Sequence, residues 1–273
     1  MAQEARSSNE PPPPRGIVRA SRPDGLLDAR RVLPSANLAE FIHHFWSVRW
    51  ALCSPFRAEA LPHPSATIRH VFEGARQRTE LAGVPTGRLV RHLTHEGATF
   101  GITFRMGMFQ PLLGAPMASI TDRVVPLDQV LGPKVKAWAR AIHEAREVDE
   151  KIAITEAFLA PLLRPPSPHL VRLRDLVERM ATDRSILRVE DVCEVSGLDA
   201  RALQRWFKAC IGVSPKWVIQ RFRLHEAAAQ LAGPRPPPLA ALAASLGYAD
   251  QAHFGRDFKR AVGQTPRAFG RRA

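Results

Sequence analysis

The residues of this chain best suited to chemistry are polar side chains grouped on short helical stretches near the C-terminus. In 201–208, two apolar residues, Leu203 and Phe207, fall on one side of a helix, and four polar residues fall on the other. These four are Arg201, Gln204, Arg205 and Lys208. In the major groove of DNA, Arg can pair with guanine and Gln with adenine. The chemistry indicated is recognition of base pairs.

The same arrangement occurs twice. The pattern R-x-F-K-x-x-x-G-x-[S/T]-P spans 205–215 and again 256–266. Upstream the match continues with one residue inserted, so that Val189, Val192, Cys193 and Gly197 correspond to Leu239, Leu242, Ala243 and Gly247. One polar helix face could belong to any helical bundle. Two copies with matched spacing favour a duplicated functional unit.

Each copy is predicted to form a helix, a tight turn and a second helix. Gly197 and Gly247 can end the first helices in the left-handed conformation, and Asp199 and Asp250 can cap the second helices. Ser214-Pro215 and Thr265-Pro266 each combine an N-cap with a proline at the first helical position, and they start two further helices. In a helix-turn-helix, the second helix enters the major groove.

The charge balance points to a polyanionic partner. The chain has 39 basic and 26 acidic residues, a net charge of +13, and a pI near 11.0. Residues 167–273 hold 18 basic and 10 acidic residues, so +8 of this surplus lies there. Nucleic acid and an anionic membrane both fit such a charge. No stretch approaches the roughly 18 apolar residues of a membrane span, so no membrane partner is expected.

Cysteine usage and the N-terminus favour a cytoplasmic protein. The three cysteines, Cys53, Cys193 and Cys210, are widely spaced and form no CxxC pair, so a disulfide framework and a four-cysteine zinc site are both disfavoured. The first 14 residues lack the apolar segment of a signal peptide. Residues 1–16, rich in Ser, Glu and Pro, are predicted to form a disordered tail.

The remainder divides into two regions, and the expected fold class is α+β. Short alternating stretches at 66–72, 88–93 and 98–104 predict a small β-barrel-like domain over 17–163. It is expected to contain a short helix at 38–42 and to end in a helical stretch over 133–163.

The second region is predicted to be all α-helical. The prolines of 164–168 mark a linker. Residues 169–273 then form a double helix-turn-helix domain, with units at about 186–210 and 239–262.

The C-terminal region resembles the AraC/XylS family of transcription regulators. The resemblance covers about 186–269 and is strongest over 197–208, 221–224 and 247–259. It implies base contacts from Arg201, Gln204, Arg205, Gln251, Ala252, His253 and Arg256, and phosphate contacts from Lys208, Lys259 and Arg260. Three features depart from the family pattern: Asp199 replaces Ser or Thr, Gly255 replaces a larger residue, and Pro236-Pro237-Pro238 precedes the second unit.

The family resemblance also implies a function. The expected protein is a sequence-specific regulator of double-stranded promoter DNA, and an activator that answers a signal through its N-terminal domain. RNA polymerase, a small-molecule effector and a second copy of the chain are its expected partners. No enzyme activity, catalytic residue, metal or cofactor is expected.

The N-terminal region resembles a poorly characterised domain that is often found ahead of the double helix-turn-helix domain. The residues that carry the likeness are Phe41-Ile42-His43-His44-Phe45-Trp46, Pro111-Leu112-Leu113-Gly114, Thr121-Asp122-Arg123-Val124-Val125-Pro126-Leu127 and Leu131-Gly132. The resemblance implies a β-rich sensor or oligomerisation domain. Leu61-Pro62-His63-Pro64 departs from the expected Leu-Pro-Asp-Gly.

Other readings remain open for several N-terminal residues. The histidines could be metal ligands of a cupin-like oxygenase fused to a DNA-binding tail, or hydrogen-bonded and surface residues; they are His43, His44, His63, His70, His92 and His95. Cys53 could be a reactive thiol or an ordinary one, and Trp46 and Trp50 could line a ligand pocket or pack in the core. A stripe of Val135, Trp138 and Ile142 could form a dimer contact or pack on the barrel. An architectural DNA binder without sequence preference is a third function class.

Overall fold

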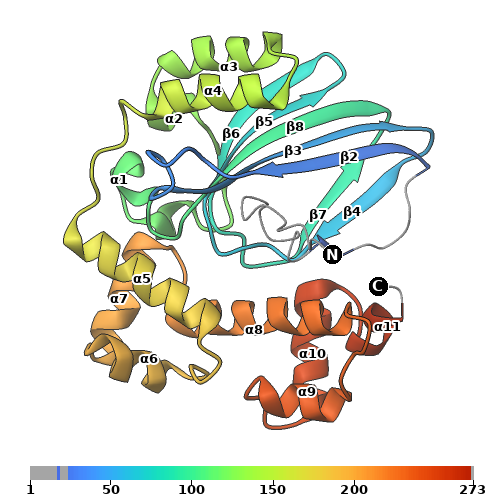
Figure 1. Cartoon of the computed structure of the whole chain (residues 1–273), viewed down its shortest axis with the longest axis vertical. Coiled ribbons are helices and arrows are strands. Elements are labelled where there is room, and N and C mark those ends of the chain that lie inside the picture. Colours follow the sequence, from blue (N-terminus) through green and yellow to red (C-terminus); the bar gives the residue numbers. More distant parts are fainter. Residues whose placement is uncertain (1–16, 19–23, 272–273) are drawn as a thin grey trace, which may run out of the picture.

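The structure of the chain is a computed structural model, and it describes residues 17–18 and 24–271 (Figure 1). The predicted disordered tail at 1–16 lies outside the described residues. The expected α+β class is confirmed, with strands in the N-terminal region and helices in the C-terminal region. Among the helices of the described residues, none is both long enough and apolar enough to cross a membrane.

The strands of the described residues form two antiparallel sheets. The bounds are β1 Ile17–Val18, β2 Gly25–Val32, β3 Ile42–Leu52, β4 Phe56–Ala60, β5 Thr67–Glu73, β6 Arg76–Ala82, β7 Leu89–Leu93, β8 Glu96–Phe104 and β9 Val124–Pro126. The six-stranded sheet has the order β2-β3-β8-β5-β6-β9, and the three-stranded sheet has the order β1-β4-β7. The alternating stretches read from the sequence correspond to β5, β7 and β8.

Two tryptophans on β3 lie against two glycines of the neighbouring strand β8. In the register, Trp46 pairs with Gly101 and Trp50 with Gly97. A Cβ atom at Gly101 would lie 2.1 Å from the Trp46 ring, and one at Gly97 would lie 2.3 Å from the Trp50 ring. The indole of Trp50, which is buried, also donates a hydrogen bond to the Thr94 carbonyl oxygen at 3.3 Å. Both rings therefore pack on the sheet itself.

The helices of the N-terminal region follow the sheet strands in sequence. They are α1 Gln110–Leu113, the 3-10 helix η1 Met117–Ile120, α2 Asp128–Leu131, α3 Lys134–Glu144 and α4 Val148–Leu159. The helical pattern expected over 133–163 is divided because Ala145 and Glu147 adopt extended backbone angles. The stripe of Val135, Trp138 and Ile142 is buried, and Trp138 stacks on Phe158 and bonds Thr155 of α4. This stripe of residues therefore packs in the hydrophobic core of the N-terminal region.

The prediction of a short helix at 38–42 is wrong. Hydrogen bonds from the Phe41 and Ile42 amides to the Leu38 carbonyl oxygen form one turn, and Ile42 is already the first residue of β3. The segment must reverse the chain between the antiparallel neighbours β2 and β3. Burial of Leu38 and Phe41 holds that turn in place.

The C-terminal region consists of helices joined by short turns. They are α5 Pro168–Thr182, α6 Val189–Ser196, α7 Ala200–Cys210, α8 Pro215–Leu231, α9 Leu239–Ser245, α10 Gln251–Val262 and α11 Pro266–Gly270. Ser167 caps α5, so this helix already begins at Pro168, inside the stretch assigned to the linker. The helix α8 joins the two helix-turn-helix units, α6–α7 and α9–α10 (Figure 1).

The hydrophobic core crosses from one region to the other. One cluster of buried side chains extends from Phe45 and Phe104 of the sheet through Leu173 of α5 to Phe207 and Phe222 of α7 and α8. A second cluster holds the second helix-turn-helix unit with the end of α8, and it includes Leu61 from the N-terminal region. The first unit therefore shares its core with the N-terminal region.

Candidate nucleic-acid interface

The helix α7 has one buried and one exposed face. The Asp199 carboxylate accepts a hydrogen bond from the Ala202 amide at 2.8 Å and so caps the start of the helix, as predicted. Leu203 and Phe207 are fully buried. All four polar residues singled out in the sequence are exposed on the remaining surface: Arg201, Gln204, Arg205 and Lys208.

The helix α10 repeats this design. The Asp250 carboxylate accepts a hydrogen bond from the His253 amide at 2.6 Å, and Phe254 and Phe258 are fully buried. The residues expected to contact DNA are all exposed: Gln251, Ala252, His253, Arg256, Lys259 and Arg260. The two helices thus present equivalent polar faces.

Two residues of α10 already have partners within the protein. The His253 imidazole lies 3.5 Å from the Asp257 carboxylate and contacts the Tyr248 ring edge-on. The guanidinium of Arg260 lies 3.1 Å from the same carboxylate. Asp257 therefore orients two side chains of the exposed face, a role that the sequence analysis missed. Its spacing, four residues after His253 and three before Arg260, is the signal that could have revealed it.

The other polar residues of the two faces are available for an external partner. These residues are Arg201, Gln204, Arg205, Lys208, Gln251, Arg256 and Lys259. Within residues 24–271, the polar groups of their side chains form no hydrogen bond and no ion pair. Three of them carry guanidinium groups, which can donate two parallel hydrogen bonds to a guanine or a phosphate.

Glycine turns set the angle within each unit. Gly197 has φ +69°, and Gly247 has φ +77°, so both adopt the left-handed conformation predicted from the sequence. A Cβ atom at Gly247 would lie 3.2 Å from the Leu187 side chain, which precedes α6. The turn of the second unit thus packs closely against the first unit.

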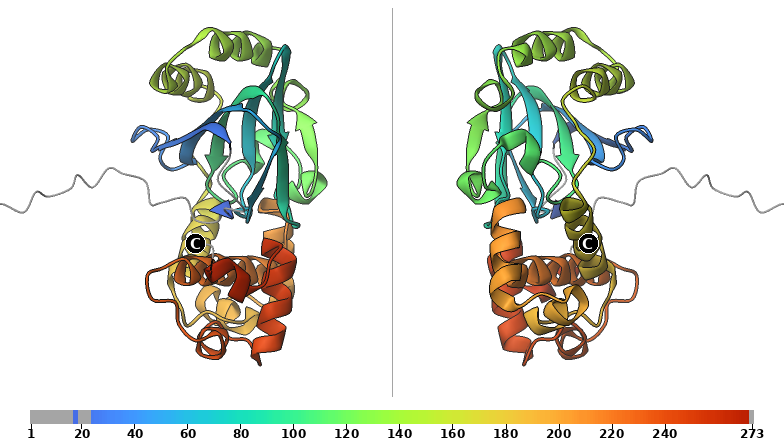
Figure 2. Two further views of the ribbon diagram at one scale, coloured as in Figure 1. Left: turned by 90° about the vertical axis from the view of Figure 1, so that its right-hand side faces the viewer. Right: turned by 90° about the vertical axis from the view of Figure 1, so that its left-hand side faces the viewer.

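The helix α8 holds the two units together through buried arginines. Arg223 is only 3% exposed and donates hydrogen bonds to the carbonyl oxygens of Asp183 and Ile186 at 2.7 and 2.8 Å. These carbonyls lie between α5 and α6, so Arg223 fixes the approach to the first unit. Figure 2 shows α7 (orange) and α10 (red-orange) on the same side of the C-terminal region in both views. The two helices that carry the polar faces therefore lie on one side of this region.

A second arginine of α8 contacts the N-terminal region. The guanidinium of Arg221 is buried, lies 4.4 Å from the centre of the Trp217 ring, and donates a hydrogen bond of 2.8 Å to the Thr86 carbonyl oxygen. Burial lowers the pKa of Arg221 to about 10. Thr86 is itself held by the Asp122 carboxylate, which accepts hydrogen bonds of 2.6 Å from its amide and its hydroxyl.

Several histidines gather where the two regions meet. The rings of His43 and His63 are 5.5 Å apart, His63 lies 5.9 Å from His225 of α8, and the Nδ1 atoms of His43 and His44 are 2.7 Å apart. Burial, with smaller effects of Arg105 and Arg31, lowers the pKa of His43 to about 4, and burial and Arg31 lower that of His44 to about 3. His43 and His44 are therefore neutral near pH 7.

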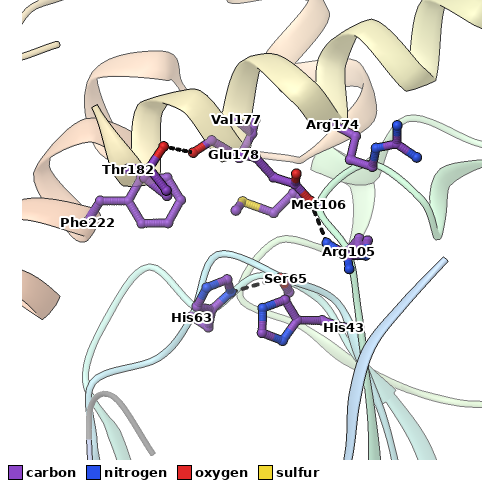
Figure 3. A pocket seen from close by; sticks show the side chains of 11 residues that line it. His43, His63, Ser65, Arg105, Met106, Arg174, Val177, Glu178, Thr182 and Phe222 are labelled. Carbon is purple, nitrogen blue, oxygen red and sulfur yellow. Dashed lines mark hydrogen bonds and ion pairs between the residues drawn. The ribbon is translucent and has the colours of Figure 1, made fainter. Parts of the chain in front are cut away.

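The histidine cluster borders a pocket of about 280 Å³ between the two regions (Figure 3). His43, His63 and Ser65 come from the N-terminal region, and Val177, Glu178 and Phe222 come from α5 and α8. His63 and Ser65 form a hydrogen bond of 3.0 Å, and Arg105 forms an ion pair with Glu178 across the junction. No pattern in the sequence predicted this pocket.

The remaining candidates lie apart from this surface. His70 bonds the Thr79 hydroxyl at 2.6 Å within the sheet, and Cys53 is exposed. Throughout the described ranges, no group of three or more His, Cys, Asp or Glu side chains is arranged to hold a metal ion.

Two family models match different parts of the chain. Residues 192–272 match a helix-turn-helix domain, and residues 30–126 match a domain of unknown function, DUF6597. No curated protein matches the chain significantly.

Solved structures with significant similarity include AraC-type regulators. A transcriptional regulator from Chromobacterium violaceum with an AraC-type DNA-binding domain is 21% identical, with a TM-score of 0.35, and the match covers 39% of this chain and 96% of that one. The C-terminal domain of AraT, a response regulator from Geobacillus stearothermophilus, is 27% identical, with a TM-score of 0.35 and coverage of 39% and 87%. ToxT from Vibrio cholerae is 10% identical, with a TM-score of 0.44 and coverage of 83% and 97%.

The helix-turn-helix match covers the first unit from Val192 onward, α8 and the second unit, so the domain contains both polar faces. The duplicated motif, its caps and its exposed basic side chains agree with that match. Residues 192–272 therefore form a helix-turn-helix domain of the AraC type, the kind of domain by which transcription regulators bind DNA.

Proposed function

We propose that α7 and α10 read two adjacent segments of the major groove, about one helical turn apart. The side chains that reach the base edges are Arg201, Gln204 and Arg205 of α7, with Gln251, Ala252, His253 and Arg256 of α10. The observation that carries this proposal is the shared exposure of these residues opposite the buried anchors Phe207 and Phe258. They also lie toward the N-terminal ends of their helices, from which recognition helices usually contact bases.

Phosphate contacts flank the base contacts in this proposal. Lys208 and Lys259 lie further along their helices, so their ammonium groups meet the DNA backbone and position the protein without reading sequence. Arg260 binds phosphate while keeping its ion pair with Asp257. That ion pair holds the guanidinium in one orientation and reduces the entropy lost on binding.

In the same proposal, the N-terminal region senses a signal and passes it to the recognition helices, and the protein activates transcription by contact with RNA polymerase. Support comes from the contacts that α8 makes with the N-terminal region, notably the Arg221 bond to Thr86. A movement of the 84–88 segment would act directly on the helix that joins the two units.

The pocket of Figure 3 is the proposed effector site. Its lining comes from both regions, so a bound small molecule would touch the β-rich region and α5 together. Apolar groups such as Met106, Val177 and Phe222 line one side of it, and the neutral histidines His43 and His63 line the other. This lining favours a small, largely apolar effector with one or two hydrogen-bonding groups.

Selection of bound sequences from a random DNA pool tests this function. We expect a motif with two conserved blocks about one helical turn apart. Binding without any enriched motif would favour an architectural DNA binder instead. Metal analysis of the purified protein separates the remaining alternative, because an oxygenase requires a bound metal close to one equivalent and a regulator of this type does not.

A further inference from the structure

The strand β2 leaves one long edge of the six-stranded sheet without a partner among the described residues. It pairs with β3 on one side only, and Figure 2 shows it (blue) at the outer side of the sheet. Six of its eight residues are exposed. Leu26 is 48% exposed, and Leu27 and the adjacent Leu33 are each 37% exposed. An exposed edge of this length is a template for pairing with another strand.

The hydrogen-bonding direction of each β2 residue follows from the register. The Cys53 amide donates to the Asp24 carbonyl oxygen, whereas the Leu52 amide donates to His95 on the β8 side. Because the direction alternates along an antiparallel strand, the even-numbered residues of β2 face β3. The backbone groups of Leu27, Ala29 and Arg31 therefore point to the free edge.

We propose that two copies of the chain form a dimer by antiparallel pairing of their β2 strands, with the two-fold axis at Ala29. Such pairing joins the two six-stranded sheets into one continuous sheet. It is isologous, because each copy contributes the same strand. Each residue then lies opposite one residue of the partner strand, and the numbers of the two residues add up to 58.

The side chains of β2 complement themselves in this register. Asp28 lies opposite Arg30 of the partner subunit, and by symmetry Arg30 lies opposite Asp28 of the partner subunit. Leu26 lies opposite Val32 of the partner subunit. These are non-hydrogen-bonded pairs, in which opposing side chains approach most closely. The interface thus gains two ion pairs and two apolar pairs on one face.

Other two-fold registers bring mismatched side chains together. A centre at Asp28 places two carboxylates opposite each other, and a centre at Arg30 places two guanidinium groups opposite each other. A centre at Leu27 places Leu26 opposite Asp28 of the partner subunit, and one at Arg31 places Arg30 opposite Val32 of the partner subunit. Like charges directly opposite are unfavourable in a sheet. The Ala29 centre pairs Asp28 with Arg30 on one face and leaves the apolar–charged pair of Leu27 and the partner's Arg31 on the other, so the match of opposite charges selects Ala29.

The charged residues of the proposed interface are free to take part. Arg30 lies 3.1 Å from Asp149 of α4, but both side chains are largely exposed, and such a pair stabilises the protein weakly. Arg49 of β3 lies across from Asp28 within the same copy, and it is exposed too. It is one strand further from the edge and so provides a matched control.

The test measures the oligomeric state of the full chain by sedimentation equilibrium, with circular dichroism to confirm folding. We expect a wild-type dimer. Asp28→Arg and Arg30→Asp should each weaken it about tenfold or more, since each change places like charges in both symmetric pairs. The double variant should restore the dimer, and Arg49→Gln, which places no like charge opposite Asp28, should leave it unchanged. Ala29→Pro removes an outward amide and should give a monomer.

Three results would overturn the proposal. A wild-type protein that stays monomeric across the accessible concentration range shows that the charges of β2 serve to keep its edge free. A dimer that survives Ala29→Pro uses another surface. A double variant as weak as the two single variants shows that residues 28 and 30 do not meet across the interface.

Discussion

The Thr121 hydroxyl donates a hydrogen bond of 2.8 Å to the backbone carbonyl oxygen of Gly212, just beyond the end of α7. Gly212 is the glycine of the first repeated motif, and the equivalent Gly263 follows α10. There the Arg88 guanidinium lies so close that a Cβ atom at Gly263 would be 1.9 Å from it. Arg88 is held in turn by Glu59, at 3.5 Å. The N-terminal region thus contacts both units at the same point of the repeat.

The first prediction concerns this contact. Thr121→Val should lower the free energy of unfolding by about 1 kcal/mol, because the Gly212 carbonyl loses its donor. Urea denaturation measures the change. Thr121→Ser keeps the hydroxyl and should stay within a few tenths of a kcal/mol of the wild type. Equal losses in both variants would mean that the methyl group, and not the hydrogen bond, stabilises the junction.

The second prediction separates base reading from phosphate binding on α7. Arg205→Ala should cost roughly 1–3 kcal/mol at one base position, because a bidentate pair with guanine is lost. Lys208→Ala should weaken binding evenly across sequences. Selection of bound sequences should show one blurred position for Arg205→Ala and an unchanged motif for Lys208→Ala. The reverse pattern would mean that the residues of α7 that contact bases lie about one helical turn away from the proposed ones.

The third prediction concerns the buried anchors of the two recognition helices. Phe207→Ala and Phe258→Ala should each lower the free energy of unfolding by about 3–5 kcal/mol, since both side chains are fully buried. DNA binding should fall through loss of folded protein. Stability is measured by denaturation and binding by titration of an operator fragment. Full stability combined with lost binding would mean that these rings face DNA.

The fourth prediction concerns ionic strength. If about six phosphates are neutralised, the logarithm of the association constant should fall with the logarithm of salt concentration with a slope of roughly −5. Fluorescence anisotropy at several salt concentrations provides the slope. Lys259→Ala removes one exposed ammonium and should make the slope shallower by about one. A wild-type slope near zero would contradict electrostatic binding.

The fifth prediction concerns pH and the histidine cluster. Burial lowers the pKa of His43 to about 4 and that of His44 to about 3, from an ordinary value of 6.5. Below pH 6.5 the unfolded chain takes up protons that the folded chain refuses, so the free energy of unfolding should fall from pH 6.5 toward pH 4. Each histidine contributes at most about 1.4 kcal/mol per pH unit.

A neutral substitution isolates this contribution. His44→Gln cannot take up a proton, so its free energy of unfolding should depend less steeply on pH than that of the wild type between these limits. Denaturation curves at several pH values measure both slopes. Identical slopes would show that His44 makes no contribution to the acid sensitivity.

The polar faces of α7 and α10 could be predicted because the signals that form them are local. A glycine turn ends the preceding helix, an aspartate cap starts the recognition helix, and two apolar residues four positions apart fix its orientation. All of them lie within about fifteen residues of sequence. The caps at Asp199 and Asp250 were confirmed for this reason.

Contacts between distant segments could not be predicted in this way. Arg221 and Thr86 are 135 residues apart, and nothing in the local pattern of α8 marks Arg221 as buried. Likewise, Trp46 and Trp50 are explained only by Gly101 and Gly97 on β8, whose register no local pattern provides. The mistaken helix at 38–42 has the same origin, because the pairing of β2 with β3 determines that turn.

The shared core has a consequence for protein engineering. Phe207 and Phe222 of the helix-turn-helix region pack in the same cluster as Phe45 and Phe104 of the sheet, and Leu61 lies in the other cluster. A foreign sensor fused at 164–168 would leave these apolar surfaces open to water. Chimeras of this regulator must therefore carry a redesigned contact surface on α5 and α8, and a change of linker alone is insufficient.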